Sequence, residues 1–319
     1  MTVSSRGTET LDRSTSVAVA NAPCSYGAFE ITVGLDPNVP DALTVLDEVT
    51  TAGYSGIDLG PLGYLGLGDE LVQRLEERRL TLAGGYLELP FSEPERFAEE
   101  LPTLDALLDV FDAAPKQDGT FAPKPTLADA GSPQRAALPG RSARDRSVGL
   151  DDAAWLRFAD SLERAIERCR ERGYEPTFHH HTATYVEAVW EIEKVLELTT
   201  IGLCFDTGHL LLGGGDPVGC LREWRDRVNH FHLKDARLDV LQSIVDDVLP
   251  VEEIWRRRAF CPFGEGDVDI DGVLSLLREQ GYTGWIVVEQ DAIPDPSHPT
   301  AQVAQEQRAN REFLRARGL

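Results

Sequence analysis

The stretch IGLCFDTGHLLLGGGDPVGCLREWRDRVNHFHLKD, residues 201–235, contains one complete strand–helix–strand unit. Two apolar runs, at 201–206 and 228–235, have the length of buried strands, and both end in polar residues. The segment between them, at 216–226, opens with Asp and Pro and has apolar residues at helical spacing. Neighbouring parallel strands are usually joined by such a helix. The stretch therefore predicts a parallel sheet covered by helices.

The same alternation extends through most of the chain. Apolar runs predict eight strands, at 16–23, 55–60, 81–89, 124–131, 175–181, 201–206, 228–235 and 284–291. Amphipathic patterns predict helices at 40–54, 68–80, 92–114 (kinked at Pro102), 151–173, 184–198, 216–226, 269–282 and 299–318. Repeated strand–helix units over this length favour an α/β fold of the (β/α)₈ TIM-barrel type. An open doubly wound sheet is the alternative, but no GxGxxG fingerprint follows the first strand.

Two segments fall outside this alternation. Residues 1–15 are polar and lack the apolar core of a signal peptide, so we expect a disordered leader before a single barrel domain at 16–319. Around the fourth strand, residues 115–148 are rich in Pro, Gly, Ala, Ser and Arg. We expect an insertion there, either a loop over the site or a disordered segment. The arginines of GRSARDRS (140–147) would reach a substrate if this loop closed over it.

Composition excludes several classes of function. The chain has 54 acidic and 31 basic residues, a formal charge of −23, and no basic stripe, which disfavours nucleic-acid binding. The five cysteines are scattered, with no CxxC pair, so a disulfide framework is not expected. No apolar run reaches membrane-spanning length. We therefore expect a cytoplasmic protein without nucleic-acid or membrane partners.

Ligand-type residues gather where the last four strands end. In a parallel barrel these ends share one face, and that face carries the active site. Because strand side chains alternate, His179 and His181 share one side of their strand while His180 points away. His232 and Lys234 likewise share one side of the seventh strand.

Four of these residues, His179, Asp206, His232 and Glu289, are predicted to converge. Their separations are 27, 26 and 57 residues, against about 31 per strand–helix unit, so they come from successive strands with one insertion. Two imidazoles and two carboxylates suit Mn²⁺, Co²⁺ or Zn²⁺. Each has a structural alternative, such as a cap of the following turn for Asp206, but a buried, unpaired Glu289 would be costly. We interpret the four as a metal site, with His180 and His230 either as structural residues or as residues that support the ligands.

Further motifs carry a family resemblance. In order, they are ANAPCSYGAFE (20–30), GYSGIDLG (53–60), HHH (179–181), DTGH (206–209), HFHLKDAR (230–237), PFGEGDVDI (262–270) and GWIVVEQD (284–291). This series resembles the inosose dehydratase family of the xylose-isomerase-like barrels. Most of that superfamily has E-x-H at the fifth strand, whereas inosose dehydratases and this chain have H-x-H.

The resemblance implies roles for single residues. It implies a divalent metal, Mn²⁺ first and Co²⁺, Zn²⁺ or Mg²⁺ as alternatives, on His179, Asp206, His232 and Glu289. Catalytic residues would be His181 or Glu88 as the base, and His209 or Lys234 as the acid. Residues in contact with substrate would be Asp58, His181, His209, Lys234 and Arg237. A homodimer or homotetramer is expected.

The expected reaction starts with proton removal beside a ketone. The leading hypothesis is a metal-dependent lyase that dehydrates a keto-cyclitol of the inosose type through an enediolate. An isomerase or epimerase of a free or phosphorylated sugar would use the same intermediate. A third alternative is a non-catalytic barrel that binds a metal or a sugar. The partner in each case is a small polyhydroxylated molecule.

Overall fold

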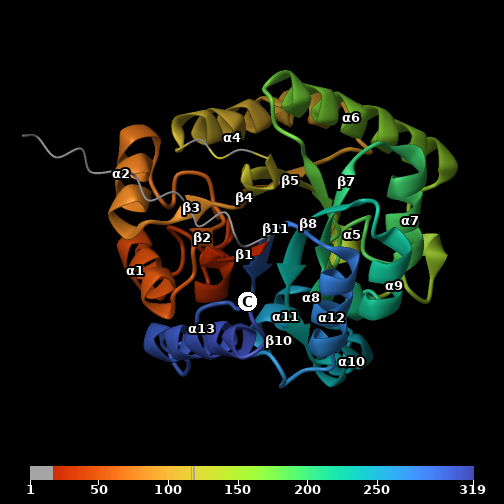
Figure 1. The fold of residues 1–319 in the computed structure, drawn as a ribbon. Coiled ribbons are helices and arrows are strands. Elements are labelled where there is room, and N and C mark those ends of the chain that lie inside the picture. The colour runs from red at the N-terminus through yellow and green to blue at the C-terminus, as the bar shows by residue number, and fades with distance from the viewer. Residues whose placement is uncertain (1–16, 116, 118) are drawn as a thin grey trace, which may run out of the picture.

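The computed structural model describes residues 17–115, 117 and 119–319 and contains a parallel barrel ringed by helices (Figure 1). The barrel segments are β1 (Val17–Asn21), β2 (Gly56–Ile57), β3 (Thr81–Leu82), β4 (Gly84–Leu89), β5 (Lys124–Asp129), β6 (Thr177–His179), β7 (Gly202–Asp206), β8 (Val228–Leu233) and β11 (Gly284–Val288). Their order in the sheet is β3-β2-β1-β11-β8-β7-β6-β5-β4, and every pairing is parallel. The predicted TIM barrel is confirmed, and the doubly wound alternative is wrong. The leader predicted at 1–15 lies outside the described residues.

The two ends of this strand order meet at Ala83, which closes the barrel. Ala83 separates β3 from β4 within one extended run. Its N–H donates to the carbonyl of Ile57 at 3.0 Å, and its carbonyl accepts from the N–H of Lys124 at 3.1 Å. The hydrogen-bond ladder therefore passes without a free edge from β2 through this run to β5.

Nine helices, among the described residues, correspond to the eight predicted ones. They are α1 (Ala42–Ala52), α2 (Gly68–Arg78), α3 (Pro94–Glu100), α4 (Pro102–Ala113), α6 (Asp152–Glu171), α7 (Val189–Leu198), α9 (Pro217–Trp224), α12 (Ile270–Gln280) and α13 (Thr300–Arg315). The kink expected at Pro102 is a full break between α3 and α4, because proline cannot donate the helical hydrogen bond. The helix predicted from residue 184 begins only at Val189, since the Glu187 carboxylate binds the N–H groups of Ala183 and Gly140 and holds a loop there.

Several short elements were not predicted. They are η1 (Pro23–Tyr26), η2 (Gly119–Phe121), α5 (Pro133–Ala136), η3 (Arg146–Val148), α8 (Thr207–Leu212), β9 (Asp235–Ala236), α10 (Leu238–Asp246), α11 (Glu252–Arg256) and β10 (Phe260–Cys261). The helices α10 and α11 lie in the sequence between β9 and β10, which pair antiparallel. The insertion expected after the seventh strand is therefore a folded part of the same domain. None of the helices in the described part of the chain is long and apolar enough to cross a membrane.

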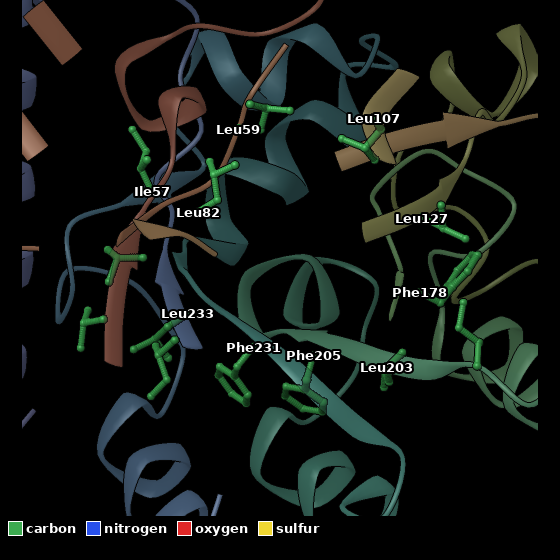
Figure 2. Close-up of a cluster of buried hydrophobic side chains, with 14 of the residues drawn as sticks. Ile57, Leu59, Leu82, Leu107, Leu127, Phe178, Leu203, Phe205, Phe231 and Leu233 are labelled. Carbon is green, nitrogen blue, oxygen red and sulfur yellow. The ribbon is translucent and has the colours of Figure 1, made fainter. Parts of the chain in front are cut away.

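Alternation along the strands separates the helix-facing core from the barrel interior. The outward side chains are large and apolar, and Figure 2 shows Phe178, Leu203, Phe205, Phe231 and Leu233 among them. The rings of Phe205 and Phe231 stack with centroids 5.4 Å apart. The inward side chains near the start of the strands are mostly small, which leaves room along the barrel axis.

Trp285 fills that room at the end of the barrel where the strands begin. Its indole is buried, and Nε1 donates to the carbonyl of Phe121 at 3.0 Å. Gly56 provides the space, because a Cβ there would lie 2.6 Å from the Trp285 ring. With this end filled, the cavity in the barrel lies at the end where the strands finish.

The segment expected as an insertion at 115–148 contains β5 and, after it, a loop anchored by Arg135. This arginine is buried, with its guanidinium 2.8 Å from Glu191 Oε1 and 3.2 Å from Glu187 Oε2. Ser142 also donates to Glu187, at 2.7 Å. The described part of the loop is therefore pinned to the start of α7. Two of the later arginines in this loop make contacts near the surface: Arg144 donates a hydrogen bond to Gln242, and the guanidinium of Arg146 lies over the Trp190 ring.

We predict that Arg135→Met lowers the free energy of unfolding by about 3–5 kcal/mol, because it leaves Glu187 and Glu191 buried without their cation. Urea denaturation followed by circular dichroism measures this loss. Arg141→Met is the matched control, because Arg141 forms its 3.5 Å ion pair with Asp145 at the surface, where such a pair contributes little to stability. Equal stability of the Arg135 variant and the wild-type protein would contradict the anchoring role.

Candidate metal centre and active site

Four side chains from neighbouring strands meet where the strands finish. His179 ends β6, Asp206 ends β7, His232 lies in β8, and Glu289 follows β11. All four are buried, and one donor atom from each lies within 4.8 Å of the other three. Asp206 Oδ2 is 3.5 Å from His179 Nε2 and 3.9 Å from His232 Nδ1. The structure thus brings together the four residues that the sequence grouped.

Asp206 acts in two ways through its two carboxylate oxygens. Oδ1 accepts the N–H of His209 at 2.8 Å and caps α8. Oδ2 is buried, receives no hydrogen bond among the described residues, and faces the other donor atoms. The backbone N–H of Asp206 donates to His180 Nε2 at 3.3 Å, so His180 supports Asp206 from the other side of the strand.

The charges and donors of the cluster fit a divalent cation. Lys234 Nζ lies 3.3 Å from Asp206, 3.0 Å from Glu289 and 2.8 Å from Asp291, so one ammonium faces three buried carboxylates. This arrangement leaves an excess of two negative charges, and burying uncompensated charge is costly. Imidazole nitrogens with carboxylate oxygens form a borderline donor set that accepts Mn²⁺, Co²⁺ or Zn²⁺.

The pKa values of the cluster reflect this competition between burial and charge. Burial opposes ionisation of Glu289, but His232 and Lys234 beside it lower its pKa to about 2. Burial opposes the Lys234 ammonium, yet Asp206, Asp291 and Glu289 raise its pKa well above the ordinary value. Gly208 makes room for this lysine, because a Cβ there would lie 2.8 Å from Lys234 Cγ. Lys234 therefore stays charged inside the site.

Asp58 lies behind His232, at the end of β2. Its Oδ2 is 3.6 Å from His232 Nε2, while His232 Nδ1 is 3.0 Å from Glu289 Oε2. A carboxylate commonly holds the second nitrogen of a metal-binding histidine. Burial raises the pKa of Asp58 to about 7. Asp58 can thus orient His232 as well as contact a ligand.

His181 and His209 form a pair whose protonation is fixed by Thr182. The Thr182 N–H donates to His209 Nδ1 at 3.2 Å, so a neutral His209 ring carries its proton on Nε2. The Thr182 carbonyl lies 3.0 Å from His181 Nδ1, which therefore carries the proton and leaves Nε2 as an acceptor. Burial lowers the pKa of His181 to about 4 and that of His209 well below its usual value. One neutral ring can accept a proton and the other can donate one.

These groups open into one cavity of about 160 Å³. It is lined by Ala22, Pro23, Cys24, Ala28, Phe29, Glu30, Ile31, Asp58, Gly60, Pro61, Tyr86, Glu88, His179, His181, His209, His232, Lys234, Trp255, Glu289 and Asp291. Glu88 accepts a hydrogen bond from the Tyr86 hydroxyl at 2.8 Å, and desolvation by the surrounding cavity raises its pKa although part of the residue is exposed. The cavity thus combines a polar floor with apolar and aromatic walls.

Arg237 does not meet the expectation of a substrate contact. Its guanidinium binds Glu265 Oε2 at 2.7 Å, and it does not line the cavity. The arginine precedes α10, where the chain has already left the barrel for the insertion. The arginines at 141, 144 and 146 do not line the cavity either.

Sequence reasoning missed Asp291, Phe29, Tyr86 and Trp255. Asp291 could have been predicted, because the strand alternation that places Glu289 in the site also places the residue two positions later there. In the structure, Asp291 Oδ2 lies 3.5 Å from His209 Nε2. Tyr86 shares its strand side with Glu88. Phe29 comes from an irregular segment, and Trp255 from the five-residue helix α11, which is too short for periodicity to show the direction of a side chain.

Known proteins resemble this chain along most of its length. The family model described as the xylose isomerase-like TIM barrel matches residues 46–317. An inosose dehydratase of Geobacillus kaustophilus (strain HTA426) is 32% identical over 260 residues, which cover 80% of this chain and 82% of that protein. An inosose dehydratase of Lacticaseibacillus casei is 30% identical over 263 residues, covering 80% and 83%.

Solved structures share the fold at lower identity. The IolI protein, solved with a binding zinc atom, matches with a TM-score of 0.64 at 12% identity, over 93% of this chain and 96% of that one. The probable 3-DHS dehydratase from Bacillus anthracis matches with a TM-score of 0.61 at 13% identity, over 93% and 98%.

We predict that His232→Ala and Glu289→Gln each reduce bound metal after dialysis to below about one tenth of the wild-type content, because each removes a donor from a four-residue set. Elemental analysis of protein loaded with Mn²⁺ or Zn²⁺ measures this. His298→Ala serves as the control, since His298 lies outside the cluster beside Glu306. His179→Ala should lose more metal than His180→Ala, and the reverse order would refute the assignment of His179.

Proposed function

Because the chain belongs to the xylose isomerase-like TIM barrel family, we propose that it is a divalent-metal-dependent dehydratase of a keto-cyclitol of the inosose type. The chain is an enzyme of the sugar isomerase and dehydratase type, in line with its curated relatives. The observation that carries the finer proposal is the His181–His209 pair, with ring centroids 4.0 Å apart beside the four converging ligand residues.

The relatives support the choice of reaction and substrate. The proteins matched over most of their length are named inosose dehydratases, and the match extends over 82% and 83% of them. The ligand set supports metal dependence, and a structural neighbour was solved with zinc. The cavity offers many hydrogen-bonding groups to a compact polyhydroxylated ketone.

The chain's own residues can carry the proton transfers of a dehydration. A divalent cation held by His179, Asp206, His232 and Glu289 would supply Lewis acidity toward a ketone oxygen. His181 Nε2 accepts the proton from the carbon beside the ketone, and the electron pair moves into the enolate. The Lys234 ammonium lies close enough to the cluster to offset the charge that develops.

Loss of water completes the reaction. His209 Nε2–H donates a proton to the hydroxyl on the next carbon, the carbon–oxygen bond breaks, and the enolate electrons form the new double bond. Asp291 Oδ2, 3.5 Å from His209 Nε2, lies beside the N–H that is given up and can orient the ring, and the Lys234 ammonium next to Asp291 offsets its negative charge. Phe29 and Trp255 at the walls restrict water around these steps.

An isomerase or epimerase is the second candidate. Glu88 lines the same cavity as His181 and has a raised pKa, so a second proton carrier is available to return the proton at another face or carbon. The non-catalytic alternative is set aside, because the curated relatives are named as enzymes.

We predict that Mn²⁺-loaded protein converts 2-keto-myo-inositol to a product with enone-type ultraviolet absorbance. His181→Ala should lower kcat at least about a hundredfold, because it removes the base. Arg237→Ala, outside the cavity, is the control and should leave the rate unchanged. Exchange of substrate hydrogen in deuterated water without loss of water would instead identify an isomerase or epimerase.

A further inference from the structure

An aromatic wall surrounds one side of the cavity. The ring of Trp255 lies 6.0 Å from Phe29 and 6.4 Å from His181, centroid to centroid. The ring of Tyr86 lies 6.0 Å from His181. All four rings line the cavity, and they come from four segments far apart in the sequence. Aromatic faces of this kind pack well on flat apolar surfaces.

Trp255 brings a second property to this wall. It sits on α11, inside the insertion between β8 and β11, and packs against the small core that holds α10 and α11 together. Its indole Nε1 is buried, yet no group among the described residues accepts a hydrogen bond from it. Buried indole N–H groups usually have an acceptor, so this donor is available to a ligand oxygen.

The charges that line the cavity select against anions. Carboxyl groups of Glu30, Asp58, Glu88, Glu289 and Asp291 line it, and Lys234 is the one basic side chain, apart from histidines, that does so in the described part of the chain. Lys234 is already within 3.0 Å of Glu289 and 2.8 Å of Asp291. Apart from the proposed metal ion, a phosphate group would therefore meet like charge without an unpaired basic side chain to bind it.

We propose that Trp255 and Phe29 hold the C–H face of an uncharged cyclic polyol, with Trp255 Nε1 donating to one of its oxygens. A ring with its hydroxyls at the equator has an apolar face and little freedom to lose on binding. An open-chain sugar of the same size has no such face and loses more rotational freedom. The cavity thus selects neutral rings over open-chain and phosphorylated sugars, which narrows the proposed function and rests on it for the reaction.

The test measures binding without turnover. Isothermal titration of Mn²⁺-loaded protein uses three probes that lack a ketone: myo-inositol, its open-chain counterpart D-mannitol, and myo-inositol 1-phosphate. We expect the wild-type protein to bind myo-inositol at least about tenfold more tightly than either other probe. Trp255→Ala should weaken myo-inositol binding at least about tenfold and D-mannitol binding less than twofold.

Two further variants make the result decisive. Trp255→Phe keeps an aromatic face, removes the N–H, and should weaken myo-inositol binding about threefold or more; it also serves if Trp255→Ala does not fold by circular dichroism. Trp190→Phe is the matched control, since half-buried Trp190 donates from Nε1 to the Ser142 carbonyl and lies away from the cavity.

Unchanged myo-inositol binding in the Trp255 variants overturns the proposal. So does wild-type binding that is absent, or equal for the three probes. Turnover of 2-keto-myo-inositol is measured separately. If the wild-type protein dehydrates it but the Trp255 variants bind myo-inositol as the wild type does, only the role of the aromatic wall is rejected. If the protein prefers myo-inositol but shows no turnover, only the dehydratase activity is rejected.

Discussion

Three buried carboxylates around a single ammonium are the constraint on which the rest of this site depends. Asp206, Glu289 and Asp291 converge on Lys234 Nζ within 3.3 Å, away from bulk water. Such a group of charges is stable only if partners surround it closely. The two nearby imidazoles, His179 and His232, complete a donor set that a divalent cation would balance. The barrel must therefore hold each strand end in register, because a small shift would separate charges that burial makes expensive.

The closed barrel meets this demand by dividing its strand residues between two environments. Outward positions carry large apolar side chains that fix the strands against the helices, as Phe205 and Phe231 do. Inward positions are small near the start of the strands and ionisable near their finish, with Trp285 filling the barrel below the site. A polar site can be buried here because the apolar packing that stabilises the fold lies on the other side of the same strands.

This division also explains what could be predicted from the sequence. The fold and the convergence of His179, Asp206, His232 and Glu289 followed from strand alternation and from the spacing of the strand–helix units. Neither signal depends on the exact residue at which an element begins or ends. The loop before α7 could not be foreseen, because it depends on Glu187 binding the distant N–H of Gly140. Trp255 and Arg237 illustrate the same limit: both belong to the insertion, and only its packing places one in the cavity and the other against Glu265.

The choice between dehydration and epimerisation rests on where the proton carriers stand. Thr182 sets both histidines of the pair, accepting from His181 through its carbonyl and donating to His209 through its N–H. The two rings lie side by side, with centroids 4.0 Å apart, so an acceptor and a donor face the ligand from the same side. Elimination of water from adjacent carbons needs such a neighbouring base and acid, whereas inversion at one carbon needs carriers on opposite faces. This adjacency supports dehydration as the reaction to which the two neutral histidines are fitted.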